Sequence, residues 1–373
     1  MRATVNPFFQ PAAGAGAPDE AALTFHRALP EYRPTPLQHC AGLASQLGLG
    51  AIYVKDESQR FGLSAFKGLG AVWALHRVRA RNSGPMTIAA ATEGNHGRAV
   101  AWAARQLGLP AVIFIPEHAA VARVDNLRRQ GARVELVPGN YDDAVRRCAT
   151  ESAIHGWQVV SDTGYEGYTE IPEWIAEGYS TLFHEADEQL RIAGLEPPDL
   201  VVIQAGVGAL LHAAVAHFRA AAPAPILVAV EPVSADALQA SIESPGGGPV
   251  PARGRQDSIM AGLNCGNVSL TAWPVVRRGV ALFLTVTDAF AEDAMRRLAR
   301  PAGTDPRIVA GETGAAGLAG LLALRSAPEL APAREWLALG PSRRVLVVNT
   351  EGATDPEAYR RIVGDLAAFP SEE

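Results

Sequence analysis

The stretch TIAAATEGNHGRAVAWAARQLGLPAVIFI, residues 87–115, decides the fold. It begins with a short apolar strand over 87–91 and passes through a turn that contains glycine. A helix is then predicted over 98–107, ended by Gly108, and a second apolar strand over 111–115. Strands and helices that alternate with such short connections form a parallel sheet covered by helices.

The same alternation runs through most of the chain. Further strands are predicted over 51–55, 133–137, 158–160, 200–204, 226–230, 281–286 and 345–348. Helices are predicted over 65–79, 120–130, 142–155, 171–194, 210–222, 288–300, 314–326 and 356–367, and a Gly- and Pro-rich surface loop over 244–257. The expected class is α/β, with two open, parallel-rich sheets that carry helices on both faces. We expect residues 80–162 to form a small domain, and residues 1–79 with 163–373 a large one.

Composition excludes several classes of protein. With 373 residues, 48% of them apolar and 19% charged, the chain can bury a sizeable core. A net charge of −6 argues against nucleic acid as a partner. The uncharged stretch 200–218 contains Gln204 and two histidines, and is not a membrane span. Cys40, Cys148 and Cys265 are too few and too scattered for a disulfide framework or a zinc site. We therefore expect a soluble, cytoplasmic protein.

Lysine is almost absent from this chain. Of 33 basic residues only Lys55 and Lys67 are lysines, and both lie in YVKDESQRFGLSAFKGLGA, residues 53–71. Arginine keeps its proton, whereas a desolvated lysine can lose it, and only lysine forms a Schiff base. Lys67 follows Phe66 in an uncharged stretch, where burial would lower its pKa. Lys67 is therefore the candidate nucleophile, while Lys55 can equally be an ordinary surface residue.

A glycine turn follows the predicted strand 200–204. In DLVVIQAGVGALLH, Gly206 and Gly208 precede a helix, so backbone N–H groups and the helix N-terminus can bind a phosphate. The dinucleotide pattern GxGxxG fails at Leu211. Glu231 nevertheless stands where a ribose-binding acid would, so an NAD-dependent dehydrogenase stays an alternative.

Other turns between a strand and a helix carry polar side chains. The candidates are Thr92, Glu93, Asn95 and His96 in ATEGNHGR, Asp162 after a strand, and the turns GETGAAG (311–317) and NTEGATD (349–355). Such turns suit a carboxylate or phosphate, although each residue can also simply cap a helix. Together with one distinctive lysine they indicate pyridoxal phosphate. HExxH, CxxC and GxSxG motifs are missing from the sequence, so neither a metalloenzyme nor a hydrolase is indicated.

The chain resembles the diaminopropionate ammonia-lyases, which are tryptophan-synthase-like (fold type II) pyridoxal phosphate enzymes. The segments that carry the resemblance are YRPTPL (32–37), VKDESQRFGLSAFKGLGA (54–71), ATEGNHGRAVAWAARQLG (91–108), NYDDAVR (140–146), SDTGYEGYTEIPEWIAEGY (161–179), QAGVGAL (204–210), IMAGLNCG (259–266), DPRIVAGETGAAGL (305–318) and NTEGATD (349–355). The resemblance implies a cofactor in the cleft between a large and a small domain, an amino acid substrate and a homodimer.

The resemblance also implies residue roles. Lys67 resembles the lysine that binds the cofactor covalently, Asn95 the contact of the ring oxygen, and Thr350 the partner of the ring nitrogen. The segment that resembles the phosphate cup consists of Gly206, Val207, Gly208 and Ala209. Thr92 and His96 lie in the loop that receives the substrate carboxylate. Glu93 and Asp162 are similar to two catalytic acids, but the family has aspartate where this chain has Glu93.

Several expected pocket residues differ from the family pattern. They are Ser64 in place of asparagine, Tyr165 in place of tryptophan, Thr313 in place of serine, and Asn264 in place of a small residue. We expect these changes to leave the cofactor chemistry intact and to affect the choice of substrate.

The expected reaction is α,β-elimination from 2,3-diaminopropionate or a close β-substituted amino acid, giving pyruvate and ammonia. Lys67 would remove the Cα proton, and Glu93 or Asp162 would help the leaving group. The resemblance implies that Glu93 stands where the family has the acid that serves the D-isomer. Alternatives that use the same cofactor are a dehydratase, a β-replacement enzyme and a racemase. A binding protein without catalysis is disfavoured because Lys67 is present.

Overall fold

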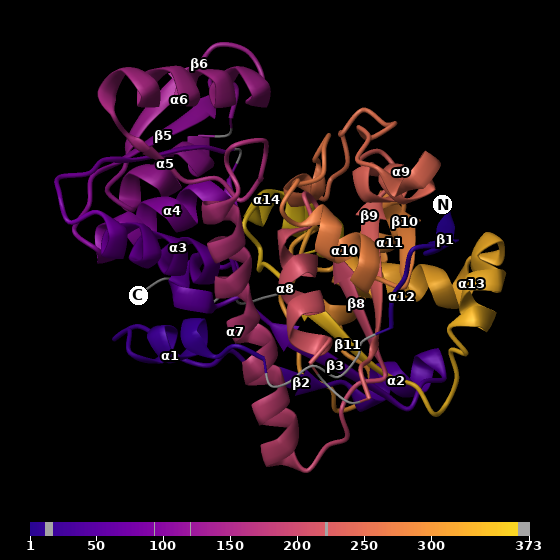
Figure 1. The fold of residues 1–373 in the computed structure, drawn as a ribbon. Helices are drawn as coiled ribbons and strands as arrows, with labels where there is room; N and C mark the ends of the chain where they lie inside the picture. The colour runs from indigo at the N-terminus through magenta and orange to yellow at the C-terminus, as the bar shows by residue number, and fades with distance from the viewer. Residues whose placement is uncertain (12–17, 93, 120, 221–222, 365–373) are drawn as a thin grey trace.

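The structure, a computed structural model, describes residues 1–11, 18–92, 94–119, 121–220 and 223–364. Its strands form two separate sheets (Figure 1). The seven-stranded sheet has the order β1 (Ala3–Val5), β10 (Leu282–Val286), β9 (Ile226–Pro232), β8 (Leu200–Gln204), β11 (Arg344–Asn349), β3 (Ala51–Asp56) and β2 (Leu37–His39). The four-stranded sheet has the order β6 (Arg133–Val137), β5 (Ala111–Pro116), β4 (Ile88–Ala91) and β7 (Gln158–Val159).

Nearly all strand pairs are parallel. Only the edge strands β1 and β2 of the larger sheet run antiparallel to their neighbours. In the middle of that sheet Val347 of β11 lies opposite Val54 of β3 and Val202 of β8. The carboxyl ends of β8, β11 and β3 consequently reach the same edge of the sheet, where ligand crevices of open α/β sheets lie.

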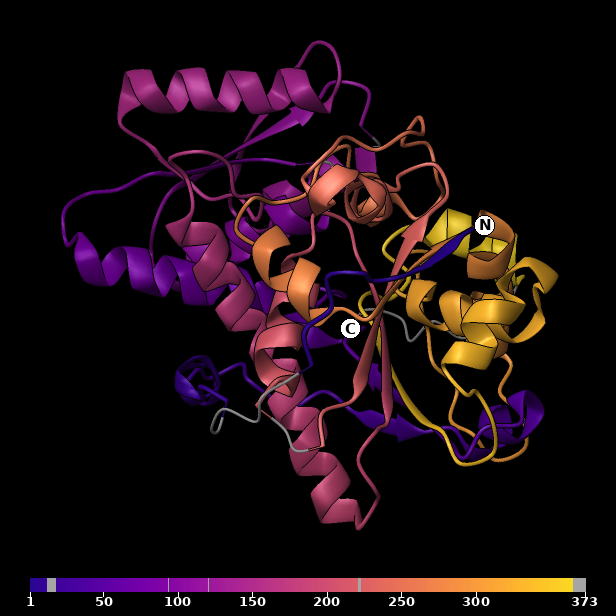
Figure 2. The same ribbon diagram turned by 45° about the vertical axis from the view of Figure 1, so that its right-hand side comes forward.

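Both faces of the larger sheet are buried. Tyr53, Leu346 and Val348 point into one core, whereas Ile52 and Val345, one position along the same strands, point into another. This follows from the two-residue period of a strand, and it explains why β3 and β11 are apolar throughout. The helices of the first core lie on one side of the sheet and those of the second core on the other (Figures 1 and 2).

Fourteen α-helices occur in the described part of the chain. They are α1 (Ala21–Arg27), α2 (Ala41–Leu47), α3 (Gly68–Arg81), α4 (Asn95–Gln106), α5 (Val121–Arg129), α6 (Tyr141–His155), α7 (Glu170–Ala193), α8 (Ala209–Phe218), α9 (Ala237–Glu243), α10 (Trp273–Gly279), α11 (Asp288–Ala299), α12 (Ala316–Ser326), α13 (Ala331–Trp336) and α14 (Pro356–Val363). Single 3₁₀ turns occur at Arg60–Gly62, Pro245–Gly247, Ala261–Leu263 and Pro328–Leu330. None of these helices combines the length and apolar character needed to cross a membrane.

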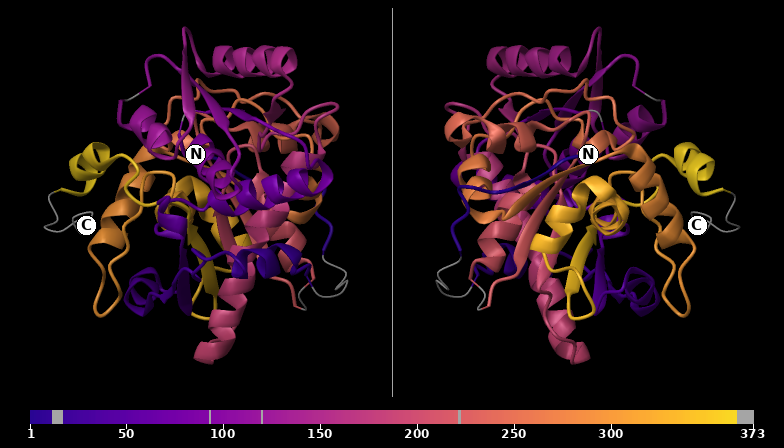
Figure 3. Two further views of the ribbon diagram at one scale, coloured as in Figure 1. Left: turned by 90° about the vertical axis from the view of Figure 1, so that its left-hand side faces the viewer. Right: turned by 90° about the vertical axis from the view of Figure 1, so that its right-hand side faces the viewer.

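The first core also extends into the smaller sheet. Its buried members include Ile88 and Ile113 from β4 and β5 together with Val201 and Leu346 from β8 and β11. Helix α3 connects the two parts, because it packs against both α4 and α7. The opposite face of the smaller sheet is covered by α6, which lies at the outer end of the molecule (Figure 3). All strands of the smaller sheet fall between residues 88 and 159, and we propose the domain boundaries given above on this basis.

The α/β class with two parallel-rich sheets is confirmed, and each predicted strand is present within two residues of its expected ends. The helices differ more. Helix α3 begins at Gly68 and not at residue 65, whereas α4 begins earlier than predicted, at Asn95. The predicted helices 210–222 and 356–367 end at Phe218 and Val363 within the described residues. The sequence did not predict β1, β2, α1, α2, α9, α10 or α13, each of which has seven residues or fewer.

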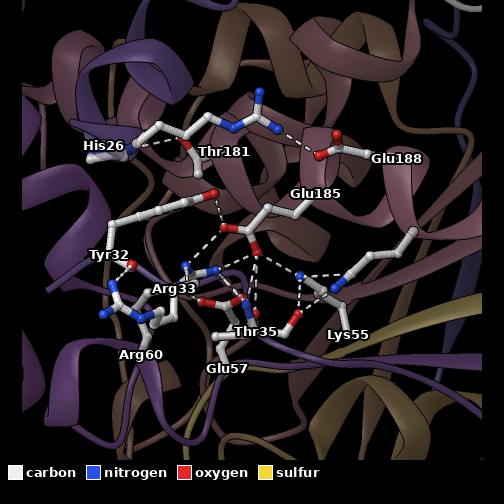
Figure 4. A network of polar contacts seen from close by, with 12 residues as sticks. His26, Tyr32, Arg33, Thr35, Lys55, Glu57, Arg60, Thr181, Glu185 and Glu188 are labelled. Carbon is white, nitrogen blue, oxygen red and sulfur yellow. Dashed lines mark hydrogen bonds and ion pairs between the residues drawn. The ribbon is translucent and has the colours of Figure 1, made fainter. Parts of the chain in front are cut away.

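A fully buried ion network lies between β3, the turn at Arg60 and α7 (Figure 4). Lys55 Nζ lies 2.6 Å from Glu185 Oε2, and Arg60 lies 2.7 Å from the same oxygen and 2.8 Å from Glu57. Tyr32 and Thr35 add hydroxyl donors to the two carboxylates. Two buried acids face two buried bases, so the network is neutral. It connects the N-terminal segment and β3 to the long helix α7.

Candidate active site

The side chain of Lys67 meets that of Asp162 at the carboxyl ends of the parallel strands. Lys67 immediately precedes α3, and Asp162 follows β7. Lys67 Nζ donates a hydrogen bond to Asp162 Oδ2 at 2.5 Å, across 95 residues of sequence. The two side chains remain 22% and 14% exposed, so a small molecule can reach the pair. Two predicted catalytic residues are thus brought together.

Electrostatics favour the charged form of both groups. Burial alone would lower the pKa of Lys67, but the charge of Asp162 outweighs it and the pKa is raised. Burial would raise the pKa of Asp162, yet the charge of Lys67 holds it well below its usual range. The expectation that burial would lower the pKa of Lys67 is therefore wrong for this form of the protein. Lys67 is therefore favoured as an ammonium beside Asp162, and it must lose one proton before it can act as a base or a nucleophile.

Two predicted residues, Thr92 after β4 and His96 in the first turn of α4, lie at the start of α4. Thr92 Oγ1 accepts the N–H groups of Gly94 and Gly97 at 2.9 and 3.0 Å, so this hydroxyl caps α4 and keeps only its own proton to donate. His96 lies beside the ion pair, with Nδ1 3.9 Å from Asp162 Oδ2 and Nε2 3.0 Å from Val160 O. Burial lowers the pKa of His96. Its Nδ1 is buried without a hydrogen-bond partner in the described residues. Glu93 lies outside those residues.

Asn95 is held by a residue that sequence reasoning missed. Asn95 Nδ2 donates to Glu351 Oε2, and Glu351 also accepts the N–H of Thr313 at 3.2 Å and the hydroxyl of Thr354 at 3.4 Å. Burial raises the pKa of Glu351. Glu351 belongs to the turn NTEGATD (349–355), which the sequence analysis identified as a candidate. An acid in that turn could therefore have been predicted to lie at the site. Within the described residues Glu351 is the acceptor of one N–H of this amide, and the contact of Asn95 with a ring oxygen stays a prediction.

The segment Gly206–Ala209 forms a glycine cup at the start of the ten-residue helix α8. Gly208 has φ 98°, which a residue with a side chain adopts only with strain. A Cβ at Gly206 would lie 2.8 Å from Cys265 Sγ and 3.1 Å from Gly262 O, so a larger residue there would require these neighbours to move. Val207 O accepts the N–H of Ser269, whose hydroxyl in turn accepts the N–H of Gly164 near Asp162. Ser269 thus connects the cup to the loop that carries Asp162, the partner of Lys67.

Gln204, at the end of β8, connects the remaining loops. Its Nε2 donates to Thr313 O and Thr350 Oγ1, both at 3.0 Å, and to Val348 O. Thr350 O accepts the N–H of Phe66, the neighbour of Lys67, at 3.1 Å. The hydroxyl of Thr313 accepts the N–H of Gly262 at 3.1 Å. Thr313 and Thr350 are both buried beside the site.

These residues fit pyridoxal phosphate. The glycine cup offers backbone N–H groups and a helix N-terminus to a phosphate, and Lys67 offers its amine to an aldehyde. His96 Nδ1, Tyr179 Oη and Gln204 Oε1 are buried and have no hydrogen-bond partner in the described part of the chain. Such groups are costly to leave unpaired, so they favour a polar molecule in this region.

The unusual pocket residues occupy different settings. Ser64 has φ 52°, a left-handed conformation that asparagine tolerates better. Tyr165 is 51% exposed and stacks on Tyr168 with ring centroids 4.9 Å apart. Asn264 closes its own loop through two hydrogen bonds with the backbone of Ser258, at 2.8 and 3.1 Å. Its amide is therefore committed to the loop, whereas the substrate contacts of Ser64, Tyr165 and Thr313 stay predictions.

Glu231, the acid that suggested a dehydrogenase, binds the backbone at the start of α9. Its two oxygens accept the N–H groups of Leu238 and Gln239, each at 2.8 Å, at the start of α9. Burial raises the pKa of Glu231 to about 8. In the described residues His, Cys, Asp and Glu side chains form no group of three that could hold a metal.

Comparison with known proteins shows to which enzyme family the chain belongs. The family model "Pyridoxal-phosphate dependent enzyme" matches residues 28–351. Diaminopropionate ammonia-lyase of Salmonella typhimurium is 39% identical over 365 residues, which cover 91% of this chain and 90% of that protein. The chain belongs to the diaminopropionate ammonia-lyase family.

Solved structures of this ammonia-lyase family agree with that assignment. The Escherichia coli enzyme in complex with an aminoacrylate–pyridoxal phosphate azomethine intermediate has a TM-score of 0.89 and 40% identity, covering 97% of this chain and 96% of that one. The same enzyme in complex with D-serine also gives a TM-score of 0.89, with 39% identity and the same coverage. The predicted family, the fold type II architecture and pyridoxal phosphate as cofactor are confirmed. The roles of individual site residues stay predictions.

Proposed function

We propose that this protein catalyses α,β-elimination of 2,3-diaminopropionate, with pyruvate and ammonia as products. The observation that carries the proposal is the Lys67–Asp162 pair, 2.5 Å apart and partly accessible, beside the glycine cup of α8. Family membership supports the reaction class, since the Escherichia coli relative has been captured with aminoacrylate, the three-carbon unit that β-elimination leaves.

When bound, pyridoxal phosphate supplies an electron sink for the charge left at Cα after proton removal. The amine of Lys67 removes that proton from the L-isomer and becomes an ammonium. Asp162 then accepts a hydrogen bond from the ammonium and stabilises its charge, as it does in the structure. The β-ammonium group leaves as ammonia, and hydrolysis of the remaining α-imine releases pyruvate and a second ammonia.

The substrate would be oriented by groups on the β4–α4 loop. The N-terminus of α4 and the ring of His96 face the region of the ion pair and suit a carboxylate. Asn95, fixed by Glu351, would contact the ring oxygen of the cofactor. Gly206, Val207, Gly208 and Ala209 would hold its phosphate, and Thr350 would face its ring nitrogen.

An assay of pyruvate and ammonia on the purified holoenzyme tests this function. L- and D-2,3-diaminopropionate would be compared with L-serine and L-threonine at equal concentrations. We expect turnover of diaminopropionate to exceed that of both hydroxy amino acids. Turnover of serine or threonine alone would contradict the proposal and make the protein a dehydratase whose pocket has changed at Ser64 and Thr313.

Glu93 provides a stereochemical test. If its carboxylate removes the Cα proton of the D-isomer, Glu93→Gln should lower kcat for D-2,3-diaminopropionate by about 100-fold and leave the L-isomer nearly unchanged. Steady-state kinetics on both isomers measure the difference. An equal loss for both isomers would show instead that Glu93 serves the leaving group or the substrate carboxylate.

We also propose that the protein is a cytoplasmic homodimer. Three free cysteines, two of them buried, suit a reducing compartment. Light scattering coupled to size exclusion should give twice the chain mass of 39.3 kDa. A mass of 39.3 kDa at micromolar concentration would contradict the dimer.

A further inference from the structure

Tyr179 on α7 is a buried tyrosine that has no role in the reaction proposed above. Its side chain is 0% exposed, and its hydroxyl has no hydrogen-bond partner among the described residues. Its ring packs on Phe66 with centroids 4.6 Å apart, and Lys67 Nζ lies 5.7 Å from the centroid of that same Phe66 ring. The phenol and the reactive amine therefore both lie against the ring of Phe66.

The charges of the ion pair act directly on this phenol. Burial raises the pKa of Tyr179 above its ordinary value, the charge of Lys67 opposes that rise, and the charge of Asp162 adds to it. Tyr179 in turn acts on Lys67, as do Asp162 and Cys265. The phenol therefore stays neutral at physiological pH, with a lone pair and a proton to offer.

Two glycines bring Tyr179 to this position. A Cβ at Gly178 of α7 would lie 2.7 Å from Gly70 Cα of α3, and a Cβ at Gly70 would lie 2.6 Å from Cε1 of Tyr179. Helices α3 and α7 can therefore touch at this point, two to three residues after Lys67. A larger residue at either glycine would push the phenol away from the lysine.

The chemistry of a primary amine indicates what the phenol does. A neutral amine has two N–H donors and one lone pair, and a base must aim that lone pair at the Cα proton. We propose that Tyr179 is a positioning residue, whose hydroxyl oxygen accepts one N–H of Lys67 while Asp162 accepts the other. The lone pair of Lys67 is then left for the substrate. This inference rests on the proposed role of Lys67 as the base for the L-isomer.

Because the chain has only two lysines and Lys55 is fully buried, acylation of the cofactor-free full chain reports on Lys67. Acetic anhydride at pH 9, followed by peptide mass spectrometry, separates Lys67 from the N-terminal amine. If the phenol holds the amine as proposed, Tyr179→Phe removes one acceptor from the Lys67 ammonium and lowers its pKa. Lys67 should then be acylated about tenfold faster in Tyr179→Phe than in wild type. Tyr53→Phe is the matched control, because the hydroxyl of Tyr53, a buried tyrosine of the same core, donates to Glu196 O in the segment that follows α7.

The holoenzyme provides the second measurement. Tyr179→Phe should lower kcat for L-2,3-diaminopropionate about 10- to 100-fold, with KM changed less than about twofold and with a larger isotope effect from α-deuterated substrate. Tyr53→Phe should match wild type in both assays.

An unchanged acylation rate in Tyr179→Phe would overturn the proposal, and so would faster acylation with an unchanged kcat. If wild type fails to turn over diaminopropionate, the proposed function fails. In that case, the acylation rate still decides whether Tyr179 holds the amine of Lys67.

Discussion

The two lysines of this chain lie twelve residues apart and differ in how completely their protons are bound. Lys55 donates to Thr35 O at 2.6 Å, to Glu185 at 2.6 Å and to Gln189 at 3.1 Å, which accounts for all three ammonium protons. Lys67 donates to Asp162 in the described structure and lies near an unpaired phenol. A lysine whose protons are all bound holds segments together. A lysine with protons that are not all bound can lose one of them and react through the lone pair that remains.

Their pKa values move in opposite directions. Burial lowers the pKa of Lys55, and nearby Arg60 adds to that, against the pull of Glu185. Burial would lower the pKa of Lys67 as well, but the charge of Asp162 outweighs it and raises that pKa. Burial alone therefore does not identify the reactive lysine. The reactive lysine is better identified by the number and sign of the charges around its amine and by how many of its protons have acceptors.

The largest effect is expected from Lys67→Ala. The variant should lose the visible absorption near 410–420 nm that a lysine-bound cofactor gives, and kcat should fall at least about 1,000-fold. Because Lys67 is partly exposed whereas Lys55 is fully buried, the urea unfolding midpoint should fall less than in Lys55→Met. Absorption spectra before and after borohydride treatment, together with the pyruvate assay, check both statements. A retained band that borohydride still bleaches would contradict the assignment.

Lys55→Met should show the opposite pattern. Removal of one partner leaves Glu185 buried beside a single base, and the free energy of unfolding should fall by about 3–5 kcal/mol. Specific activity per folded molecule should be unchanged. Arg27→Ala is the control. Arg27 forms an exposed ion pair with Glu188, which lies on α7 like Glu185, and the loss of this pair should lower the free energy of unfolding by less than about 1 kcal/mol. Equal losses in the two variants, measured by urea titration, would contradict the distinction.

Asp162→Asn should make Lys67 resemble a buried lysine without a charged partner. Without the charge of Asp162, burial dominates and the pKa of Lys67 falls, so a larger neutral fraction is present at any pH below that value. Acylation of Lys67 in the cofactor-free protein at pH 9 should accelerate more than tenfold, while kcat falls about 10- to 100-fold. An acylation rate that stays at the wild-type value would show that Asp162 does not control the charge of Lys67.

The same pair gives a pH dependence of stability with a definite sign. The pKa of Asp162 is depressed in the folded chain, so its contribution is present above its unfolded value and is lost as the pH falls. The pKa of Lys67 is raised, so its contribution is present below its unfolded value and is lost as the pH rises past it. Asp162→Asn should therefore flatten the pH dependence of the unfolding midpoint at both extremes.

The smallest effect concerns the backbone between the two lysines. Ser64 has φ 52°, three residues before Lys67, whereas Lys55 lies in a regular strand. Ser64→Asn should raise the free energy of unfolding by less than about 1 kcal/mol, because asparagine tolerates this conformation better. Ser45→Asn, at an exposed helical position, should not stabilise the chain. A loss of stability in Ser64→Asn would show that the side chain of Ser64 matters more than its backbone.

Local pattern predicted the elements of this fold well. The apolar strands β3, β8 and β11 were predicted because a strand buried on both faces has few polar positions. The short helices α9 and α10 were missed because seven residues give too few turns for a helical period to be recognised. The ends of α3 and α4 moved because Ser64 and Thr92 end or begin the local structure with backbone and capping geometry that spacing does not encode.

The candidate site was predicted as a set of residues, not as a set of contacts. Lys67 and Asp162 were named separately, and their pairing depends on two loops 95 residues apart. Glu185, which holds Lys55, lies 130 residues away on α7, and Glu351, which holds Asn95, is 256 residues away. Tyr179 was read only as part of a family motif. Such partners become visible only when the sheets are assembled, since a strand or helix period indicates a face and not the neighbour that covers it.

The first core crosses from the larger sheet to the smaller one through α3, α4 and α7 without interruption. Because the two sheets share one hydrophobic core, unfolding of one sheet would expose apolar side chains of the other, and we expect the two sheets to unfold together. Calorimetry should therefore record a single heat-absorption peak, and hydrogen exchange should give β4 and β8 similar protection. Any movement that admits a substrate would then be a small sliding of packed helices across this shared interior, and not the swing of two independent halves.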